Sequence, residues 1–257
     1  MKQSIILFLV IIASSLLKAQ SIYQELDSVS IQDLEMTSYE KDKDAEAVVL
    51  YDFGESYFNP TSSGFDLILD RTIRIKIFDE AGLKFANIDI STYIQNTDVD
   101  EIAIVSASTY NLEEGEIVKT ELKEDQIFSE SGFGTLTMKF AMPNVKPGSV
   151  IEYRYYIKSR NIEDFNDWEF QWTIPVVHSE YQVKLIPYYH YKWVIQSMSG
   201  KSFYAKKTKT AEGLEKSIHG VKYREMIHTF VMKDLPSFKD VDYISSKSDY
   251  SMKMDWQ

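Results

Sequence analysis

The sequence predicts an all-β fold, an antiparallel sandwich of two sheets with short helical segments near the N-terminus. Apolar and polar side chains alternate over several short runs, and turn-forming residues separate these runs. No ten-residue amphipathic helix lies between the runs, which argues against an α/β fold.

The N-terminus has the features of a secretory signal peptide. Lys2 provides a basic start, an apolar run covers residues 5–12, and Ala19 precedes polar sequence. The apolar stretch is shorter than the roughly 20 residues that cross a bilayer as a helix. We therefore predict cleavage between Ala19 and Gln20, a mature domain of residues 20–257 without a membrane span, and a periplasmic or extracellular location after passage across the inner membrane.

Two short helical segments are predicted after the signal peptide. Ser30 followed by Asp33 is typical of a helix N-terminus, because each side chain can accept a hydrogen bond from the other residue's backbone N–H. The charged run from Tyr39 to Ala47 predicts a second short turn of helix.

Four runs with a period of two predict half-buried strands: residues 69–77, 150–158, 181–185 and 230–235. In the first run, Leu69, Ile73, Ile75 and Ile77 share one parity, and Asp70, Thr72, Arg74 and Lys76 share the other. We expect each strand to bury its apolar parity and expose its polar parity. Trp168, Phe170 and Trp172 share a parity and predict a further strand.

Three turn sequences predict hairpins: residues 79–82, 111–115 and 147–148, each of which contains glycine. The polar stretch 161–167 predicts a long loop, at which the domain could divide into two subdomains.

Composition excludes several classes of function. The chain has 257 residues, of which 44% are hydrophobic and 26% charged, as in a folded globular protein. It contains no cysteine, which excludes disulfides, thiolate metal sites and a thiol nucleophile. The formal net charge of -11 disfavours binding to nucleic acid.

The sequence predicts no metal site, no cofactor and no catalytic residues. The four histidines have no metal-ligand spacing, and the acidic groups do not follow a calcium-loop pattern (His178, His190, His219, His228; Asp98, Asp100, Glu101; Glu113, Glu114, Glu116; Asp240, Asp242). No GxSxG sequence provides a serine nucleophile. An envelope hydrolase that uses the acidic pairs is the weakest of our hypotheses.

An aromatic segment supplies the candidate binding residues, which are Tyr188, Tyr189, Tyr191 and Trp193. Rings of this kind stack on sugars and anchor partner peptides. They also pack inside strands and cores, and the sequence leaves both interpretations open.

The order of several segments resembles the DUF3857 family, the β-rich domain that precedes transglutaminase-like domains in bacterial envelope proteins. The similar segments are residues 42–51, 74–82, 143–153, 167–170 and 174–176, and the resemblance spans about residues 31–242.

This resemblance implies an immunoglobulin-like β-sandwich that is accessory to a neighbouring cysteine catalytic domain. The catalytic residues of that neighbour have no counterpart in this sequence, and residues 230–256 resemble the segment that leads toward it. We expect the chain to be a fragment or truncation and not to be an enzyme. Its expected function is that of a binding or scaffolding module whose partner is a protein or the adjacent domain. The alternative is a carbohydrate-binding module that uses the four aromatic residues.

Overall fold

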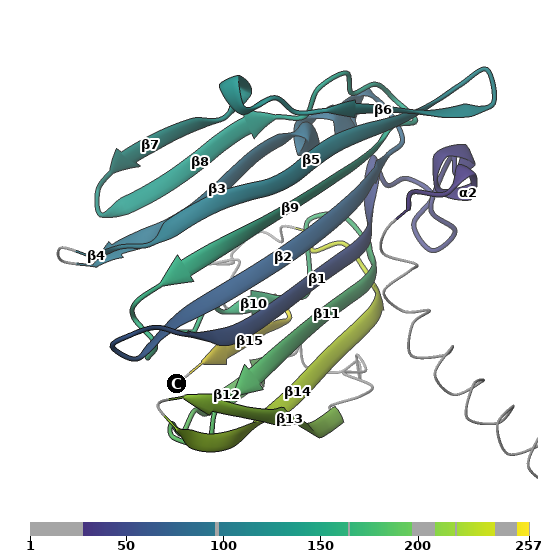
Figure 1. The fold of residues 1–257 in the computed structure, drawn as a ribbon. Helices are drawn as coiled ribbons and strands as arrows, with labels where there is room; N and C mark the ends of the chain where they lie inside the picture. Colours follow the sequence, from purple (N-terminus) through teal and green to yellow (C-terminus); the bar gives the residue numbers. More distant parts are fainter. Residues whose placement is uncertain are drawn as a thin grey trace, which may run out of the picture.

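A computed structural model describes residues 28–95, 98–163, 165–196, 209–218, 220–239 and 251–256. The fold is mostly β, as predicted, but its strands form three sheets where the sequence predicts two (Figure 1). The predicted signal peptide, residues 1–19, lies outside the described residues.

The largest sheet has eight strands in the order β13-β14-β11-β1-β2-β9-β5-β6. Each strand predicted from an alternating run lies within it, in β2, β9, β11 or β14. The bounds are β1 (Ala47–Pro60), β2 (Phe65–Ile77), β5 (Glu101–Glu113), β6 (Glu116–Glu121), β9 (Val150–Ser159), β11 (Val176–Leu185), β13 (Lys209–Ile218) and β14 (Val221–Leu235).

Two small sheets pack on one face of the large sheet. The first has the order β4-β3-β8-β7, with β3 (Asn87–Gln95), β4 (Asp98–Val99), β7 (Phe128–Gly132) and β8 (Thr135–Ala141). The second has the order β10-β15-β12, with β10 (Trp168–Glu169), β12 (Trp193–Gln196) and β15 (Lys253–Trp256). Phe140 of the first contacts Tyr153 of β9, and Trp168 of the second stacks on Tyr181 of β11. The rings of Tyr153 and Tyr181 therefore face the two small sheets.

One strand pair departs from the predicted antiparallel arrangement. β1 and β11 are parallel, with Val49 opposite Val176 and Tyr57 opposite Lys184, whereas the other strand pairs of the described residues are antiparallel. Parallel neighbours need a long connection. Here the chain between β1 and β11 forms the other half of the large sheet and most of the small sheets.

The predicted helix start at Ser30 is confirmed, and the helix changes the burial of the strands beneath it. In α2 (Ile31–Glu35), Ser30 Oγ accepts from Asp33 N–H, and Asp33 Oδ2 accepts from Ser30 N–H. Leu34 of α2 packs with Val29 and Val150 against the large sheet.

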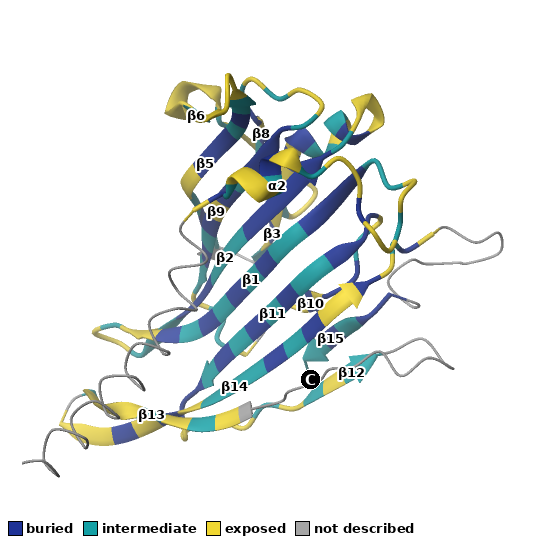
Figure 2. Ribbon diagram, turned by 90° about the vertical axis from the view of Figure 1, so that its right-hand side faces the viewer, coloured by how far each residue is buried: buried dark blue, intermediate teal, exposed yellow. Residues whose placement is uncertain are grey.

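Arg74 and Lys76 are therefore buried, contrary to the expectation that the polar parity of their strand is exposed. The segment with α2 covers this end of the sheet. Farther along, β1 shows the expected alternation of buried and partly exposed residues (Figure 2).

The turns are confirmed in part. Glu114 and Gly115, both at positive φ, connect β5 and β6 as a hairpin. Residues 79–82 instead lead into the 3-10 helix η1 (Glu80–Ala86), and residues 147–148 lead from β8 to β9, so these two turns connect different sheets.

Two short elements differ from the prediction. Residues 39–46 form turns with a bridge between Tyr39 and Asp42, not a turn of helix, and Ala47 already begins β1. The segment 168–172 is a strand only at β10. The remaining described helix is η2 (Glu124–Gln126), a single 3-10 turn.

A single main core joins the three sheets. It includes Ile75 and Val183 of the large sheet, Ile90 of the four-stranded sheet and Met254 of the three-stranded sheet. Phe165, inside the predicted loop 161–167, is also buried in this core. Within the described residues, no helix has the length and hydropathy needed to span a bilayer.

Candidate functional site

The predicted aromatic segment lies in the connection between β11 and β12 and divides into exposed and packed rings. Tyr188 and Tyr189 are 46% and 39% exposed. Tyr191 and Trp193 are only partly exposed and pack against the core. The segment is therefore not a row of four equally accessible rings.

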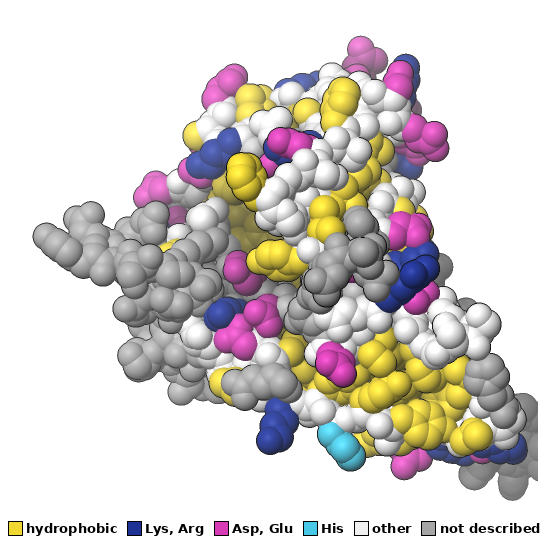
Figure 3. All heavy atoms as spheres, turned by 90° about the vertical axis from the view of Figure 1, so that its left-hand side faces the viewer, with side chains coloured by type: hydrophobic (Ala, Val, Ile, Leu, Met, Phe, Trp, Pro, Cys, Tyr) yellow, Lys and Arg dark blue, Asp and Glu magenta, His cyan; other side chains and the backbone are white. Residues whose placement is uncertain are grey.

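The exposed tyrosines belong to a continuous aromatic cluster. Tyr188 contacts Tyr223 at 5.9 Å between ring centroids, and Tyr223 contacts Phe65 at 6.4 Å. Phe58 joins the two halves, because its ring lies 5.9 Å from Phe65 and 6.1 Å from Tyr189. At the end of the molecule where β12, β13 and β14 lie in Figure 1, the space-filling view shows a broad area of hydrophobic side chains (Figure 3).

Tyr191 and Trp193 connect this cluster to the three-stranded sheet. The Tyr191 ring lies 4.7 Å from Phe165, and its hydroxyl donates to Ile162 O at 2.8 Å. Burial raises the pKa of Tyr191 to about 12. Trp193 packs edge-on against Phe230 and Trp256, at 5.7 and 5.5 Å. These contacts give both residues a structural role.

A buried ion pair between β1 and β2 is the strongest polar feature of the interior, and the sequence analysis did not identify it. Arg71 Nε and Nη2 donate to the two carboxylate oxygens of Asp52, at 2.8 and 2.7 Å. Trp172 Nε1 donates to the same carboxylate at 3.0 Å. The Asp52 carboxylate raises the pKa of Arg71 even though burial opposes this, so the guanidinium stays charged.

The ion pair lies beside a stack of flat side chains. The Arg71 guanidinium lies 4.3 Å from the centre of the Trp168 ring. The Tyr181 ring stacks on the same indole at 4.7 Å between ring centroids, with 3° between the ring planes. Trp168 Nε1 donates to Ser179 Oγ at 3.1 Å. A Cβ atom on Gly54 would lie 2.2 Å from Trp168 Cζ3, so Trp168 fits only over a glycine.

A parity signal in the sequence indicates this interior site. Arg71 lies on the same parity as Leu69 and Ile73, and Asp52 lies on the same parity as Gly54 and Phe58. When an acidic and a basic residue both occupy positions that alternate in step with buried apolar residues on neighbouring strands, a buried ion pair is the expected arrangement. The pairing of Asp52 with Ile73 and of Gly54 with Arg71 then sets them side by side.

Two tyrosines of β9 complete the surroundings of Arg71. Tyr153 and Tyr155 are buried, and burial is the largest cause of their raised pKa values. Both rings stay neutral near pH 7. The interior site has one carboxylate, one guanidinium and neutral hydroxyls, and its carboxylate is held by three donated hydrogen bonds.

The remaining titratable candidates are spread over the described residues and form no common cluster. His178 lies 2.9 Å from Glu180, His228 lies 3.2 Å from Thr210 with its pKa lowered by burial, and His190 is exposed. Among the acidic residues, Glu113 pairs with Lys146 at 2.9 Å, and Glu101 pairs with Lys158.

His219, Asp240 and Asp242 lie outside the described residues. Over the described part of the chain, no three His, Cys, Asp or Glu residues are arranged to hold a metal ion.

A cavity of about 260 Å³ lies beside β5, the strand next to the edge strand β6 of the large sheet. It is lined by residues 104–108 of β5 and by Glu121, Leu122, Glu124 and Ile127 of the connection from β6 to β7. The sequence analysis did not identify this cavity, because its two walls belong to segments whose contact no local pattern specifies.

Comparisons with known proteins give a family and a structural neighbour. Residues 70–228 match the model of DUF3857, described as a domain of unknown function with a solved structure. The crystal structure of a "putative protease" from Parabacteroides distasonis ATCC 8503 is similar in fold, with a TM-score of 0.59 and 13% sequence identity. The similarity covers 82% of this chain and 40% of that protein, so the chain spans less than half of its neighbour's length. Among curated proteins, none matches the chain.

Proposed function

Since the chain belongs to the DUF3857 family, we propose that it is a non-catalytic binding or scaffolding module of the bacterial envelope, accessory to a transglutaminase-like catalytic domain. One observation carries this proposal. A similar fold occurs within a longer protein described as a "putative protease", of which it covers 40%. A chain without cysteine cannot itself supply the thiol nucleophile of such a catalytic domain.

The aromatic cluster is the surface that we assign to the partner. Tyr188 and Tyr189 are partly exposed, and each is held by a ring contact: Tyr188 with Tyr223, and Tyr189 with Phe58. Tyrosines held in this way lose little conformational entropy on binding and are typical of interface anchors.

Site-specific photo-crosslinking in the native cells tests the partner surface. A photoreactive amino acid at position 188 should crosslink to a protein or domain with a transglutaminase-like fold, identified by mass spectrometry. The matched control is position 117, since Ile117 is also exposed but lies on β6 at the opposite edge of the large sheet. Equal crosslinking from both positions would contradict the assignment.

An activity screen tests the non-catalytic part of the proposal. The purified protein should not turn over peptide, ester or glycan substrates. Specific turnover by the purified chain would contradict the proposal and favour the hydrolase hypothesis instead.

Carbohydrate binding is the second candidate, and the exposed pair Tyr188 and Tyr189 is the observation that favours it. Trp193 is unsuitable as a probe, because its replacement would also disturb the packing of Phe230 and Trp256. The double variant Tyr188→Ala/Tyr189→Ala should lose glycan-array binding, and Tyr93→Ala, an exposed tyrosine of β3, should retain it. Binding retained by the double variant would contradict this site.

The envelope location and the immunoglobulin-like topology are parts of the same proposal. The basic start and apolar run of residues 1–19 support secretion. N-terminal sequencing of the native protein should begin at Gln20, and a sequence that begins at Met1 would contradict cleavage. The packing of antiparallel sheets around one core supports an immunoglobulin-like sandwich, although the parallel β1–β11 pair is unusual for it.

A further inference from the structure

β5 has a free edge over half of its length. Its residues 101–110 pair with β9 on one side, but its pairing with β6 on the other side begins only at Ser108. Leu122 N–H donates to Ala107 O at 2.9 Å, and the chain then leaves β5 toward η2. Among the described residues, none pairs with residues 101–106 on this side. Unpaired strand edges bind extended chains through backbone hydrogen bonds.

The neighbouring sheet does not close this edge. β3 and β4 pair only through Ile94 with Val99 and Gln95 with Asp98. Beyond this short pairing, β3 continues in the four-stranded sheet, and β5 continues in the large sheet. Along residues 87–93, the partner strand of β3 is β8 and not β5.

The free edge also contains a bulge that presents a side chain outward. The register between β5 and β9 shifts between Ile104 and Ser106, which places Val105 at the irregularity. Val105 is 51% exposed. Bulges of this kind are common where a sheet edge ends its own pairing or approaches a site.

The cavity adjoins residues 104–107 of the same free edge. Its volume of about 260 Å³ fits one long side chain. Ala107, Leu122 and Ile127 provide apolar walls. Glu121 and Glu124 provide carboxylates, and no lysine, arginine or histidine lines the cavity.

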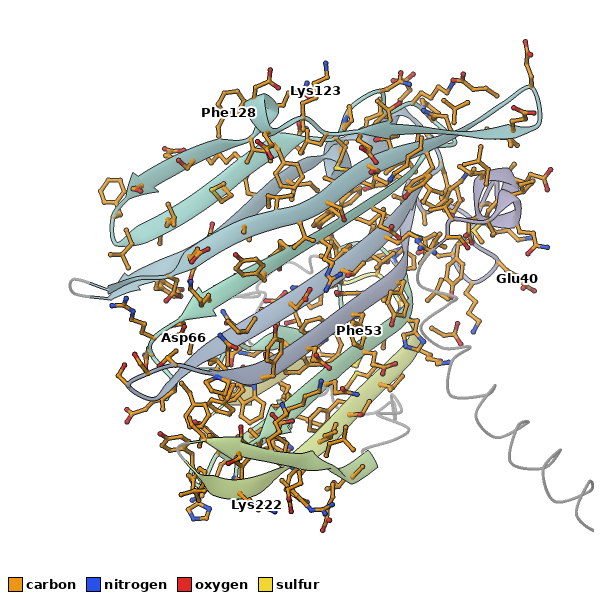
Figure 4. All side chains as sticks on the ribbon, viewed as in Figure 1. Glu40, Phe53, Asp66, Lys123, Phe128 and Lys222 are labelled. Carbon is orange, nitrogen blue, oxygen red and sulfur yellow. The ribbon has the colours of Figure 1, made fainter. Side chains whose placement is uncertain are left out.

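The charge of the two glutamates is not fully compensated. Glu121 pairs with Lys119 at 2.6 Å, whereas Glu124 is exposed and has no ion pair with any described residue. Lys123 lies between Glu121 and Glu124 in the sequence, and its side chain projects away from the sheet at the top of the molecule (Figure 4). A cavity with some apolar walls and two acidic residues at its rim suits the methylene stem and cationic head of lysine or arginine.

We propose that the free edge of β5 binds an extended polypeptide segment as an added strand, with one basic side chain of that segment in the cavity. This inference deepens the proposed binding function and uses a surface distinct from the aromatic cluster. The added strand pairs with the backbone of residues 103–106, and the cation lies beside Glu124.

Peptide titration of the full chain tests both components of this interaction. The probe is a capped octapeptide of alternating valine and lysine, and its affinity is measured by calorimetry. A peptide of alternating valine and glutamate should bind at least about tenfold more weakly, because it places like charges beside Glu124. The lysine peptide with alternate backbone amides N-methylated should also bind at least about tenfold more weakly, because it cannot add as a strand.

Two charge reversals locate the site. Glu124→Lys should weaken binding of the lysine peptide at least about tenfold, whereas Glu116→Lys should change it by less than about twofold. Glu116 is exposed near the β5–β6 turn and is not part of the cavity, so the control has the same change in net charge. Amide hydrogen exchange of residues 103–106 should slow when the peptide is bound.

Four results would overturn the inference. They are no binding of the lysine peptide, equal binding of the N-methylated peptide, equal effects of the two reversals, and protection at another edge or at the aromatic cluster. If the peptide does not bind, and the wild-type protein self-associates whereas Glu124→Lys does not, the edge is instead assigned to a second copy of the chain. Since crosslinking at position 188 is independent of this edge, failure here is distinguishable from failure of the proposed partner surface.

Discussion

Gly54 shows how one missing side chain determines the packing of a whole segment. It lies in the middle of β1, where glycine normally weakens a strand, yet Trp168 occupies the space where a Cβ atom would be. The indole then contacts both Arg71 and Tyr181. The absence of a side chain at position 54 therefore permits the stack that attaches β10 to the large sheet.

Gly54→Ala should destabilise the protein by about 1–3 kcal/mol, because the new methyl group overlaps the Trp168 ring. Chemical denaturation followed by circular dichroism measures this change. Gly132→Ala is the matched control, since Gly132 is also in a strand and a Cβ atom there meets nothing within 4 Å. Similar losses for both variants would contradict the steric explanation.

Lys76 is a buried cation that connects α2 to the sheet. Its Nζ donates to Leu34 O and Gly148 O, both at 2.6 Å, and burial lowers its pKa to about 8. An uncharged amine can still donate both bonds. Lys76→Met should destabilise the protein by about 1–3 kcal/mol, because two buried carbonyls lose their donor.

The same lysine predicts a pH dependence of stability. Above about pH 8 the folded protein loses the Lys76 proton, whereas the unfolded chain keeps it until near the ordinary value of 10.5. The unfolded state then binds more protons, so this residue's contribution to the free energy of unfolding rises between those pH values. The stability difference between wild type and Lys76→Met should widen across this range, and parallel pH profiles would contradict it.

At the level of elements, two arginine–aspartate pairs of the large sheet differ in environment but not in geometry. Arg71 binds Asp52 through two hydrogen bonds of 2.8 and 2.7 Å on the covered face, and Arg154 binds Asp70 through two of the same lengths on the outer face. The Asp52 side chain is fully buried, whereas that of Arg154 is 49% exposed. Solvent screens the outer pair but not the inner pair.

Asp52→Ala should therefore cost about 3–5 kcal/mol, because it leaves the Arg71 charge buried without its partner. Asp70→Ala should cost less than about 1 kcal/mol. Urea denaturation measures both variants. The fluorescence of Trp168 and Trp172 should change only in Asp52→Ala, since Trp172 also loses its hydrogen bond to that carboxylate. Equal losses would show that burial does not distinguish the pairs.

At the level of the whole molecule, one core connects all three sheets. Buried residues before and after the loop 161–167, such as Ile157 and Phe170, belong to the same core as Phe165 within it. We therefore expect a single cooperative unfolding transition. Tryptophan fluorescence, which reports mainly on the three-stranded sheet, and far-ultraviolet circular dichroism should give coincident curves. Two separate transitions would support a subdomain boundary at residues 161–167.

The parts of the fold that depend on local pattern were predictable. Alternation over residues 150–158 and 181–185 identified β9 and β11, and Ser30 with Asp33 identified the start of α2. Hairpin pairing was predictable only where the turn is tight, at Glu114 and Gly115. The sequence located the aromatic segment of the candidate site, but it could not distinguish the exposed Tyr188 from the packed Trp193.

The sequence by itself determined the mostly β class, the buried parity of the main strands and the family, because periodicity and residue order are properties of neighbouring positions. The tertiary structure decided the parallel pairing of β1 with β11, the burial of Lys76 beneath α2, the contact of Arg71 with Trp168 and the free edge of β5. Each of these depends on which distant segments meet. No local pattern encodes that choice, because it is set by the packing of two small sheets and one helix on opposite faces of the large sheet.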